Sequence, residues 1–271
     1  MYGTALAPTL QWPAEALWQA IEPLLPGFSV EILPELASTN TELMRRARLG
    51  RADPLLLVAE RQTAGRGRLG RTWSSHGEEQ APEPHASLTF SLGLPLSPAD
   101  WSGLSLAVGL AVANSLHSDV QLKWPNDLWV AGRKLGGILI ETVAVADVRY
   151  AVIGIGLNIR MPVEQDLRTP AASLRELLPE ANAAQALERV TLPLVQTVLR
   201  FASEGFAPLR NAYEARDLLF GRDVVCTDGT EGVARGVDES GALVLQTAQG
   251  LKKINSAEVS VRPLSPFIEG H

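Results

Sequence analysis

The segment from Gly65 to Arg71, GRGRLGR, places three arginines among three glycines. Glycine lets backbone amides come close to a ligand, and a guanidinium group offers paired donors to carboxylate or phosphate oxygens. The segment therefore predicts a loop that binds an oxygen anion through Arg66, Arg68 and Arg71. A solvated arginine loop that holds no ligand is the alternative.

The first six residues of this segment also fit the G-x-G-x-x-G pattern of dinucleotide-binding folds. That pattern requires a helix to open at the glycines, but the residues that follow, TWSSHGEEQAPEP, cannot form an amphipathic helix. No Lys-Ser or Lys-Thr pair follows the last glycine, as a phosphate-binding P-loop would require. Both nucleotide-binding motifs are therefore excluded.

A second segment that could do chemistry is KWPNDLWVAGRKLGGILIE, from Lys123 to Glu141. Its Pro-Asn-Asp turn can direct polar side chains into a cleft. On the strand that follows, alternation puts Lys134 and Gly136 on one face and Leu135 and Gly137 on the other. Glycines inside a strand indicate close approach of a ligand or another backbone, although a tightly packed hairpin would also use them.

A third segment, GIGLNI from Gly154 to Ile159, predicts a buried strand with one polar residue, Asn158. Asparagine at the end of a strand is more often a turn former than a ligand. This segment alone indicates little about function.

Hydrophobic periodicity predicts the elements that must position these segments. We expect helices over 14–25, 38–50, 103–117, 183–203 and 206–219, and strands over 28–36, 54–60, 88–94, 120–124, 135–145 and 149–159. Thr39 and Glu42 have the spacing of a capping box at the start of the second helix. Residues 74–87, which are polar, acidic and contain Pro and Gly, predict an exposed loop.

Composition limits the class of protein. The 271 residues are 46% hydrophobic and 20% charged, with a net charge of −6, which is typical of a globular protein and unlike a generic nucleic-acid binder. The single cysteine, Cys226, excludes an internal disulfide and fits a reducing cytoplasm. The four histidines are too scattered to predict a metal site. No apolar run is long enough to cross a membrane, and the N-terminus lacks a secretory signal.

From Gly221 onward the sequence changes to short β-rich runs separated by Asp-Gly, Ser-Gly and Gln-Gly turns. Turns at this spacing predict a small β-barrel. We therefore expect two domains, comprising residues 1–220 and 221–271.

Together these segments resemble the biotin protein ligases. The matching pieces are STN at 38–40, ERQTAGRGRLGRTW at 60–73, KWPNDLWV at 123–130, RKLGGILIE at 133–141 and GIGLNI at 154–159. The resemblance implies an α+β fold, with a class II synthetase-like mixed or antiparallel sheet, flanking helices and a small SH3-like C-terminal β-barrel.

The resemblance also implies a two-step ligase reaction. Biotin and ATP, the latter with Mg²⁺, would give biotinyl-5′-adenylate and pyrophosphate, and biotin would then pass to a lysine of a biotin carboxyl carrier protein. We expect such an enzyme to be cytoplasmic. The sequence leaves open whether it forms a homodimer.

The resemblance assigns roles to individual residues. Catalysis would depend on Lys134, Arg68 and Asp127. Biotin would be bound by Ser38, Thr39, Asn40, Gln62, Arg66, Gly67, Arg68, Lys134 and Gly137. ATP and the adenylate would be bound by Arg68, Arg71, Lys123, Asn126, Lys134 and Asn158.

Several of these roles have alternatives. Helix capping would also explain Ser38 and Thr39, and both roles are compatible. Asp127 would orient or deprotonate the acceptor lysine, but an Asx turn explains it equally well. Trp73 and Trp124 could stack on a base, although a tryptophan in the core is the more common case.

Two other functions compete with biotin ligation. A lipoate–protein ligase shares the fold and the adenylate chemistry, but the arginine loop and the KWPND segment favour biotin. A non-enzymatic module that grips an anionic partner is the alternative from another class. About 28 residues precede the first predicted strand, too few for the DNA-binding domain of some family members, so we expect no DNA binding and no repressor activity.

Overall fold

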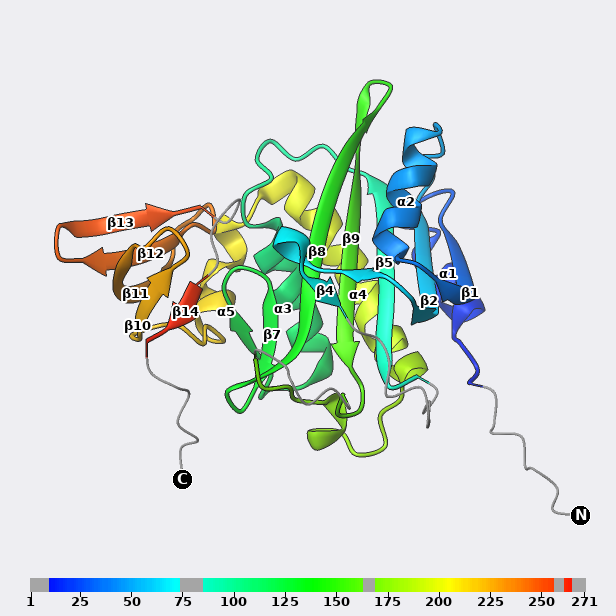
Figure 1. Cartoon of the computed structure of the whole chain (residues 1–271). Coiled ribbons are helices and arrows are strands. Elements are labelled where there is room, and N and C mark those ends of the chain that lie inside the picture. The colour runs from blue at the N-terminus through cyan, green and yellow to red at the C-terminus, as the bar shows by residue number, and fades with distance from the viewer. Residues whose placement is uncertain (1–9, 74–84, 163–168, 256–260, 265–271) are drawn as a thin grey trace, which may run out of the picture.

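A computed structural model describes residues 10–73, 85–162, 169–255 and 261–264, and Figure 1 shows two β-sheets with flanking helices. The larger sheet contains β1 (Ser29–Leu36), β2 (Leu55–Gln62), β5 (Ser87–Pro95), β6 (Gln121–Lys123), β7 (Asp127–Val130), β8 (Arg133–Val145) and β9 (Val148–Asn158). The smaller sheet contains β10 (Asp223–Cys226), β11 (Glu231–Val237), β12 (Leu243–Thr247), β13 (Gly250–Ile254) and β14 (Val261–Pro263). The α-helices are α1 (Ala14–Ile21), α2 (Thr39–Arg48), α3 (Leu104–Leu116), α4 (Ala183–Glu204) and α5 (Arg210–Glu214).

The larger sheet is mixed, with the strand order β1-β2-β5-β9-β8-β7-β6. Strands β1 and β2 run parallel, and the remaining neighbours run antiparallel. The smaller sheet, in the order β13-β12-β11-β10-β14, is antiparallel. The predicted fold class is confirmed, while the division into domains at residue 221 and the SH3-like closure of the smaller sheet stay predictions.

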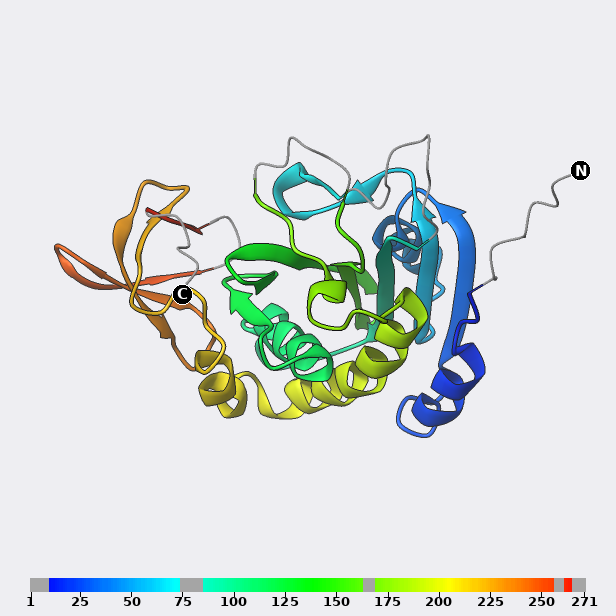
Figure 2. The ribbon, with the colours of Figure 1, turned by 90° about the horizontal axis from the view of Figure 1, so that it is seen from below.

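Helices cover the two faces of the larger sheet unequally. Helix α3 is apolar almost all round, and it packs against α4 and against strands β6 to β8. A helix that is hydrophobic on every side must be buried on every side, which explains its place between the sheet and α4. On the opposite face, α2 contacts β8, β5 and β9. Figure 2 shows α3 and α4 on one side of the sheet and, on the other, the loop of residues 65–71, here called the arginine–glycine loop.

Most predicted elements lie within a few residues of their observed bounds, but the helix predicted over 206–219 is wrong. The chain forms a 3₁₀ turn (Ala207–Leu209) and then α5, which ends at Glu214. The following residues pair with β6 instead: Leu122 N donates to Arg216 O at 2.8 Å, and Leu218 N donates to Leu122 O at 2.9 Å. Pairing with a sheet edge thus replaces the last helical turns.

Lys123 and Trp124 connect the larger sheet to the smaller one. Lys123 Nζ donates to Val261 O at 2.8 Å and lies 5.4 Å from the centre of the Trp129 ring. Burial lowers the pKa of Lys123 to about 8, against the opposing charge of Asp127. The fully buried Trp124 donates through Nε1 to Gly241 O at 3.1 Å. Trp124 is therefore a core tryptophan, the more common of the two cases expected for it.

The acidic segment 74–87, predicted to be an exposed loop, lies outside the described residues except for its last three positions; Ser87 begins β5.

Of the helices that the structure describes, none combines the length and apolar character that crossing a membrane requires.

The buried carboxylate of Asp217, in the segment that pairs with β6, makes the stability of the fold depend on pH. Burial is the main reason that the pKa of Asp217 is raised to about 6. Its Oδ1 accepts from Leu219 N at 2.9 Å, whereas its buried Oδ2 has no hydrogen-bond partner among the described residues. The folded state therefore binds the Asp217 proton more tightly than the unfolded state, and this stabilisation, present below about pH 4, is lost as the pH rises through about 6.

We predict that Asp217→Asn abolishes this loss of stability with rising pH. Between pH 4 and 7 the free energy of unfolding of the wild type should fall relative to the variant by about 1 to 3 kcal/mol. Urea unfolding across the pH range measures this, with Asp147→Asn, at an exposed hairpin turn, as the control. Parallel curves for the wild type and Asp217→Asn would show that the carboxylate is not buried as described.

Candidate active site

A cavity of about 120 Å³ opens on the α2 face of the larger sheet, beneath the arginine–glycine loop. Segments far apart in the sequence meet there: the start of α2, the end of β2, the loop, the turn before β7, and the middle of β8 and β9. Its lining includes twelve of the predicted site residues: Ser38, Thr39, Asn40, Gln62, Arg66, Gly67, Arg68, Arg71, Asn126, Asp127, Lys134 and Gly137.

The start of α2 forms one wall of the cavity. Ser38 is the N-cap residue, and its Oγ accepts from Thr41 N at 3.4 Å. The predicted Thr39–Glu42 capping box is wrong, because Ser38 is the N-cap and Gln62 Oε1 accepts from Thr39 N at 2.8 Å, with the Thr39 hydroxyl 3.2 Å away. This bond from β2 makes Thr39 the first helical residue and fixes the helix start against the strand.

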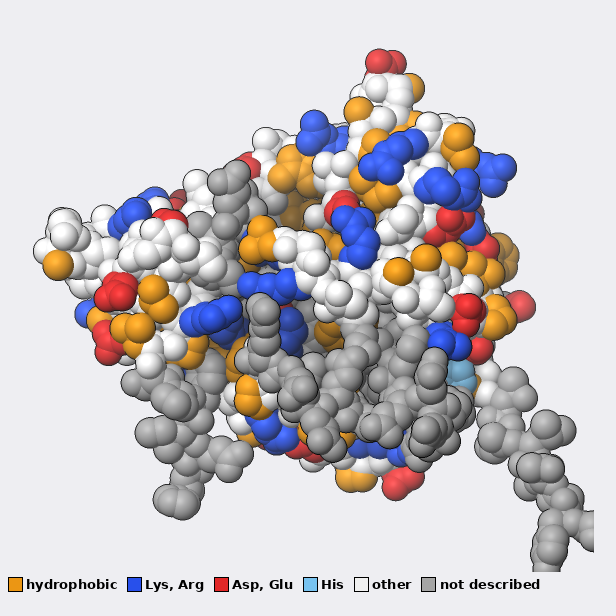
Figure 3. All heavy atoms as spheres, in the orientation of Figure 1, with side chains coloured by type: hydrophobic (Ala, Val, Ile, Leu, Met, Phe, Trp, Pro, Cys, Tyr) orange, Lys and Arg blue, Asp and Glu red, His pale blue; other side chains and the backbone are white. Residues whose placement is uncertain are grey.

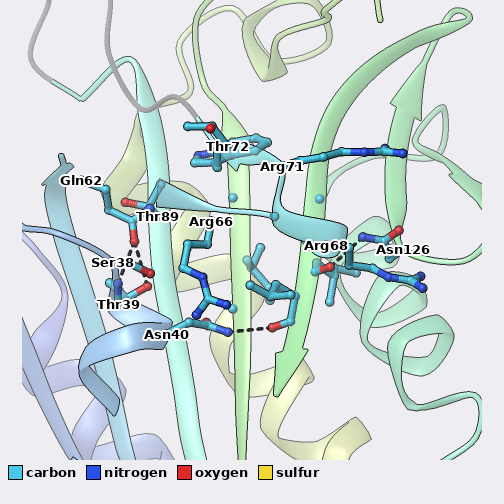
Figure 4. A pocket seen from close by; sticks show the side chains of 18 of the residues that line it. Ser38, Thr39, Asn40, Gln62, Arg66, Arg68, Arg71, Thr72, Thr89 and Asn126 are labelled. Carbon is cyan, nitrogen blue, oxygen red and sulfur yellow. Dashed lines mark hydrogen bonds between the residues drawn. The ribbon is translucent and has the colours of Figure 1, made fainter. Parts of the chain in front are cut away.

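The arginine–glycine loop crosses the cavity as a narrow hairpin. β3 (Gly65–Arg66) pairs with β4 (Thr72–Trp73), and Gly67 N donates to Arg71 O at 2.7 Å. Figure 4 shows Arg66 pointing from this loop toward Asn40, while Arg68 lies on the side of Asn126. Burial lowers the pKa of the Arg68 guanidinium, and the charge of Asp127 opposes that shift. Arg68 nonetheless remains a cation at neutral pH because guanidinium titrates far above it.

Lys134 faces the cavity in an ion pair. Its Nζ lies 2.6 Å from Asp127 Oδ1, and the two side chains are 29% and 15% exposed. An ammonium group has three donor hydrogens, so this pair leaves Lys134 able to contact further oxygen atoms. The cavity thus brings Lys134, Arg66 and Arg68 together, and Figure 3 shows Lys and Arg side chains gathered across the middle of this face.

The prediction of which β8 residues share a face of the sheet is wrong for Lys134. Simple alternation puts Lys134 with Gly136, yet the cavity is lined by Lys134 and Gly137. A β-bulge explains this, because Leu128 pairs with Gly136 while the next residue of β7, Trp129, pairs with Lys134. One extra residue on β8 shifts the alternation by one position, and Lys134 and Gly137 therefore share a face.

Two predicted ligands of the adenylate lie outside the cavity lining. Lys123 contacts Val261, as described above, and Asn158 Nδ2 donates to Ala172 O at 3.0 Å and to Lys134 O at 3.4 Å. Asn158 thus connects the end of β9 to β8 and to the segment after residue 168. The cavity gives no support to adenylate roles for these two residues, which stay predictions.

Sequence analysis missed several lining residues, namely Thr72, Thr89, Phe90, Ile138, Leu139, Gly154, Ile155 and Gly156. The signal that could have revealed two of them was the alternation of glycines in GIGLNI. A Cβ on Gly154 would overlap Asn40 Oδ1, and a Cβ on Gly156 would lie 2.5 Å from the Trp73 indole. The absent side chains on β9 make room for one residue from α2 and one from the loop, so Trp73 packs on the sheet.

The described residues contain no group of three or more His, Cys, Asp or Glu side chains that could hold a metal ion.

Comparisons with known proteins agree with this geometry. Residues 33–158 match the biotin/lipoate A/B protein ligase family, and residues 220–262 match the biotin protein ligase C terminal domain. The bifunctional ligase/repressor BirA of Escherichia coli is 36% identical over 257 residues, covering 88% of this chain and 75% of the relative. The biotin–[acetyl-CoA-carboxylase] ligase of Mycobacterium tuberculosis is 33% identical over 250 residues, covering 85% and 88%.

Among solved structures, the biotin protein ligase from Aquifex aeolicus in complex with biotin and ATP superposes with a TM-score of 0.73 at 28% identity. The match covers 86% of this chain and 98% of that one. The chain described here belongs to the biotin protein ligase family.

Because Gly154 makes room for Asn40, we predict that Gly154→Ala destabilises the protein. The added methyl group must displace a buried amide, and overpacking of this kind typically costs about 1 to 3 kcal/mol. Chemical unfolding measures the change in the free energy of unfolding. Gly137→Ala is the control, since its Cβ would meet its nearest neighbours at 3.5 Å; equal effects of both substitutions would contradict the proposed reason.

Proposed function

We propose that this protein activates biotin with ATP and transfers it to a lysine of a biotin carboxyl carrier protein, as a biotin–[biotin carboxyl carrier protein] ligase. One observation carries the proposal: Arg66, Arg68 and Lys134 line one cavity together with the uncharged side chains of Ser38, Thr39 and Gln62. We infer the substrate from membership of the family, and the chemistry from the charged residues that line the cavity.

The first step joins two anions. A carboxylic acid with an ordinary pKa of about 4 to 4.5 is already ionised at neutral pH, so biotin needs no base before it attacks the α-phosphate of ATP. Pyrophosphate leaves, and a mixed anhydride of biotin and AMP forms. The barrier arises from repulsion between the reactants, and cations fixed beforehand reduce it while stabilising the charge that grows on the phosphates.

Individual residues divide this work in the proposed complex. Ser38, Thr39 and Gln62 line the part of the cavity that would take the biotin ring system, with Asn40, Gly67 and Gly137 beside them. Lys134 would bridge the biotin carboxylate and the α-phosphate, using donors that its bond to Asp127 leaves over. Arg66 and Arg68 would close over biotin and the phosphates, and Arg71 and Asn126 would contact the adenylate.

In the second step the acceptor lysine must attack as a neutral amine. The amine attacks the acyl carbon of the adenylate, AMP leaves with the bonding pair of the broken acyl–phosphate bond, and the nitrogen loses a proton. Asp127 lies in the cavity beside Lys134. It would orient the incoming amine or accept its proton, while also holding Lys134 in place.

The proposal extends to location and partners. Mg²⁺ would enter as part of the substrate Mg-ATP. We propose that the enzyme works in the cytoplasm, acts on a carrier domain and neither binds operator DNA nor represses transcription. A specific gel shift with operator DNA at physiological salt would contradict the last point.

The decisive experiment incubates a purified carrier domain with the protein, biotin and Mg-ATP, and follows the carrier by mass spectrometry. We expect a mass increase equal to one biotinyl group that depends on biotin and on ATP. A parallel incubation with lipoate distinguishes the competing ligase. Anion binding without pyrophosphate release would instead favour a non-enzymatic binding module.

Replacing Lys134 tests the proposed chemistry directly. We predict that Lys134→Ala keeps the fold but lowers the rate of adenylate formation about a hundredfold or more, because a preorganised cation at the reacting oxygens is lost. Biotin-dependent exchange of pyrophosphate into ATP measures this rate. Lys252→Ala, at a half-exposed lysine of the smaller sheet, is the control and should exchange normally. Adenylate formation by Lys134→Ala at the wild-type rate would refute the role of Lys134.

A further inference from the structure

A buried chain of hydrogen bonds runs beneath the cavity from α2 to β8. Asn40 Nδ2 lies 3.1 Å from Leu139 O and 3.0 Å from Glu141 Oε2, and Ser91 Oγ lies 2.7 Å from both Asn40 Oδ1 and Thr39 Oγ1. Thr39, Asn40 and Ser91 are each at most 3% exposed. Buried polar groups at these distances must pair donors with acceptors.

Leu139 O and the Glu141 carboxylate together determine the direction of these hydrogen bonds. A carbonyl and a carboxylate can only accept, so the amide nitrogen of Asn40, and not its oxygen, must face Leu139 and Glu141. The amide oxygen then faces Ser91, which must donate to it. Because a hydroxyl has one hydrogen, the 2.7 Å contact between Ser91 and Thr39 requires Thr39 to donate to Ser91, and the Thr39 hydroxyl then has no hydrogen for Gln62 Oε1, 3.2 Å away.

Both amide hydrogens of Asn40 are therefore used within the protein. Asn40 cannot donate a hydrogen bond to a ligand without giving up Leu139 or Glu141. Its amide nitrogen therefore supports the cavity wall, and the predicted place of Asn40 in the biotin pocket stays a prediction.

The other carboxylate oxygen of Glu141 holds the arginine–glycine loop. Glu141 Oε1 lies 3.2 Å from Arg66 Nη1, and the two side chains are 23% and 51% exposed. One carboxylate on β8 thus contacts both the wall of the cavity, through Asn40, and the loop that crosses it, through Arg66. Glu141 itself is absent from the residues that line the cavity.

We propose that Glu141 is a positioning residue of the biotin site, which fixes the amide of Asn40 in the wall and the guanidinium of Arg66 over the cavity without touching the substrate. This inference rests on the proposed function, because it assumes that the loop closes over biotin. Glu141 acts through other residues, so its loss weakens binding and retention and leaves the chemical step at Lys134 intact.

The test compares Glu141→Gln with the wild type. Glutamine keeps an oxygen for Asn40 but removes the charge that holds Arg66. We expect the KM for biotin in pyrophosphate exchange to rise about threefold to tenfold, as fits loss of a partly exposed ion pair. The adenylate should dissociate faster by a similar factor, with kcat at saturating biotin and ATP within about twofold of the wild type.

Two further variants separate the two contacts of Glu141. Ser91→Ala removes the donor to Asn40 Oδ1 and leaves Arg66 paired, so it should raise the KM for biotin without faster adenylate release. Glu35→Gln breaks a pair of the same length, 3.2 Å to Arg61, whose side chains are both about half exposed; it should change neither quantity. Unfolding midpoints of all variants show whether the fold is retained.

Three outcomes for a folded Glu141→Gln would overturn the proposal: an unchanged KM and unchanged release, a lower kcat with an unchanged KM, or a lower KM. The last would mean that Glu141 competes with the ligand for Arg66. Failure of the proposed function is distinguishable from all of these. In that case the wild type itself would show no pyrophosphate exchange dependent on biotin.

Discussion

The site depends on keeping cations concentrated beside one cavity in a protein of net charge −6. Lys134 is held by Asp127 of β7, and Arg66 is held by Glu141 of β8. Each carboxylate fixes the position of a cation that would otherwise adopt many rotamers in solvent. The cations are thereby in place before any anion arrives, which is the condition under which electrostatic stabilisation of a transition state is most effective.

The geometry of β8 and β9 makes this arrangement accessible. The bulge on β8 brings Lys134 to the same face as Gly137, and the glycines of β9 leave room for Asn40 and Trp73. The glycines of β9 are therefore the sites where Asn40 of α2 and Trp73 of β4 reach the sheet. The apolar helix α3 packs against β8 from the opposite face, so a buried helix supports the strand that carries Lys134.

The KWPND segment has a double role, which explains why its residues do not behave alike. Asp127 faces the cavity, and Asn126 lines it while donating to Ile138 O at 2.8 Å. Lys123 and Trp124 point toward the smaller sheet instead and contact Val261 and Gly241. One short stretch thus joins the cavity to the C-terminal sheet.

The sequence by itself determined the order of most elements, the fold class, the membership of the family and most of the polar residues that line the cavity, because hydrophobic period and local motifs report on short-range structure. It did not determine that Lys134 shares a face with Gly137, where the last helix ends, or that Lys123 turns away from the cavity. Those features depend on a bulge, on pairing with β6 and on contact with β14. Each is an interaction between residues distant in the chain, so only the tertiary structure decided them.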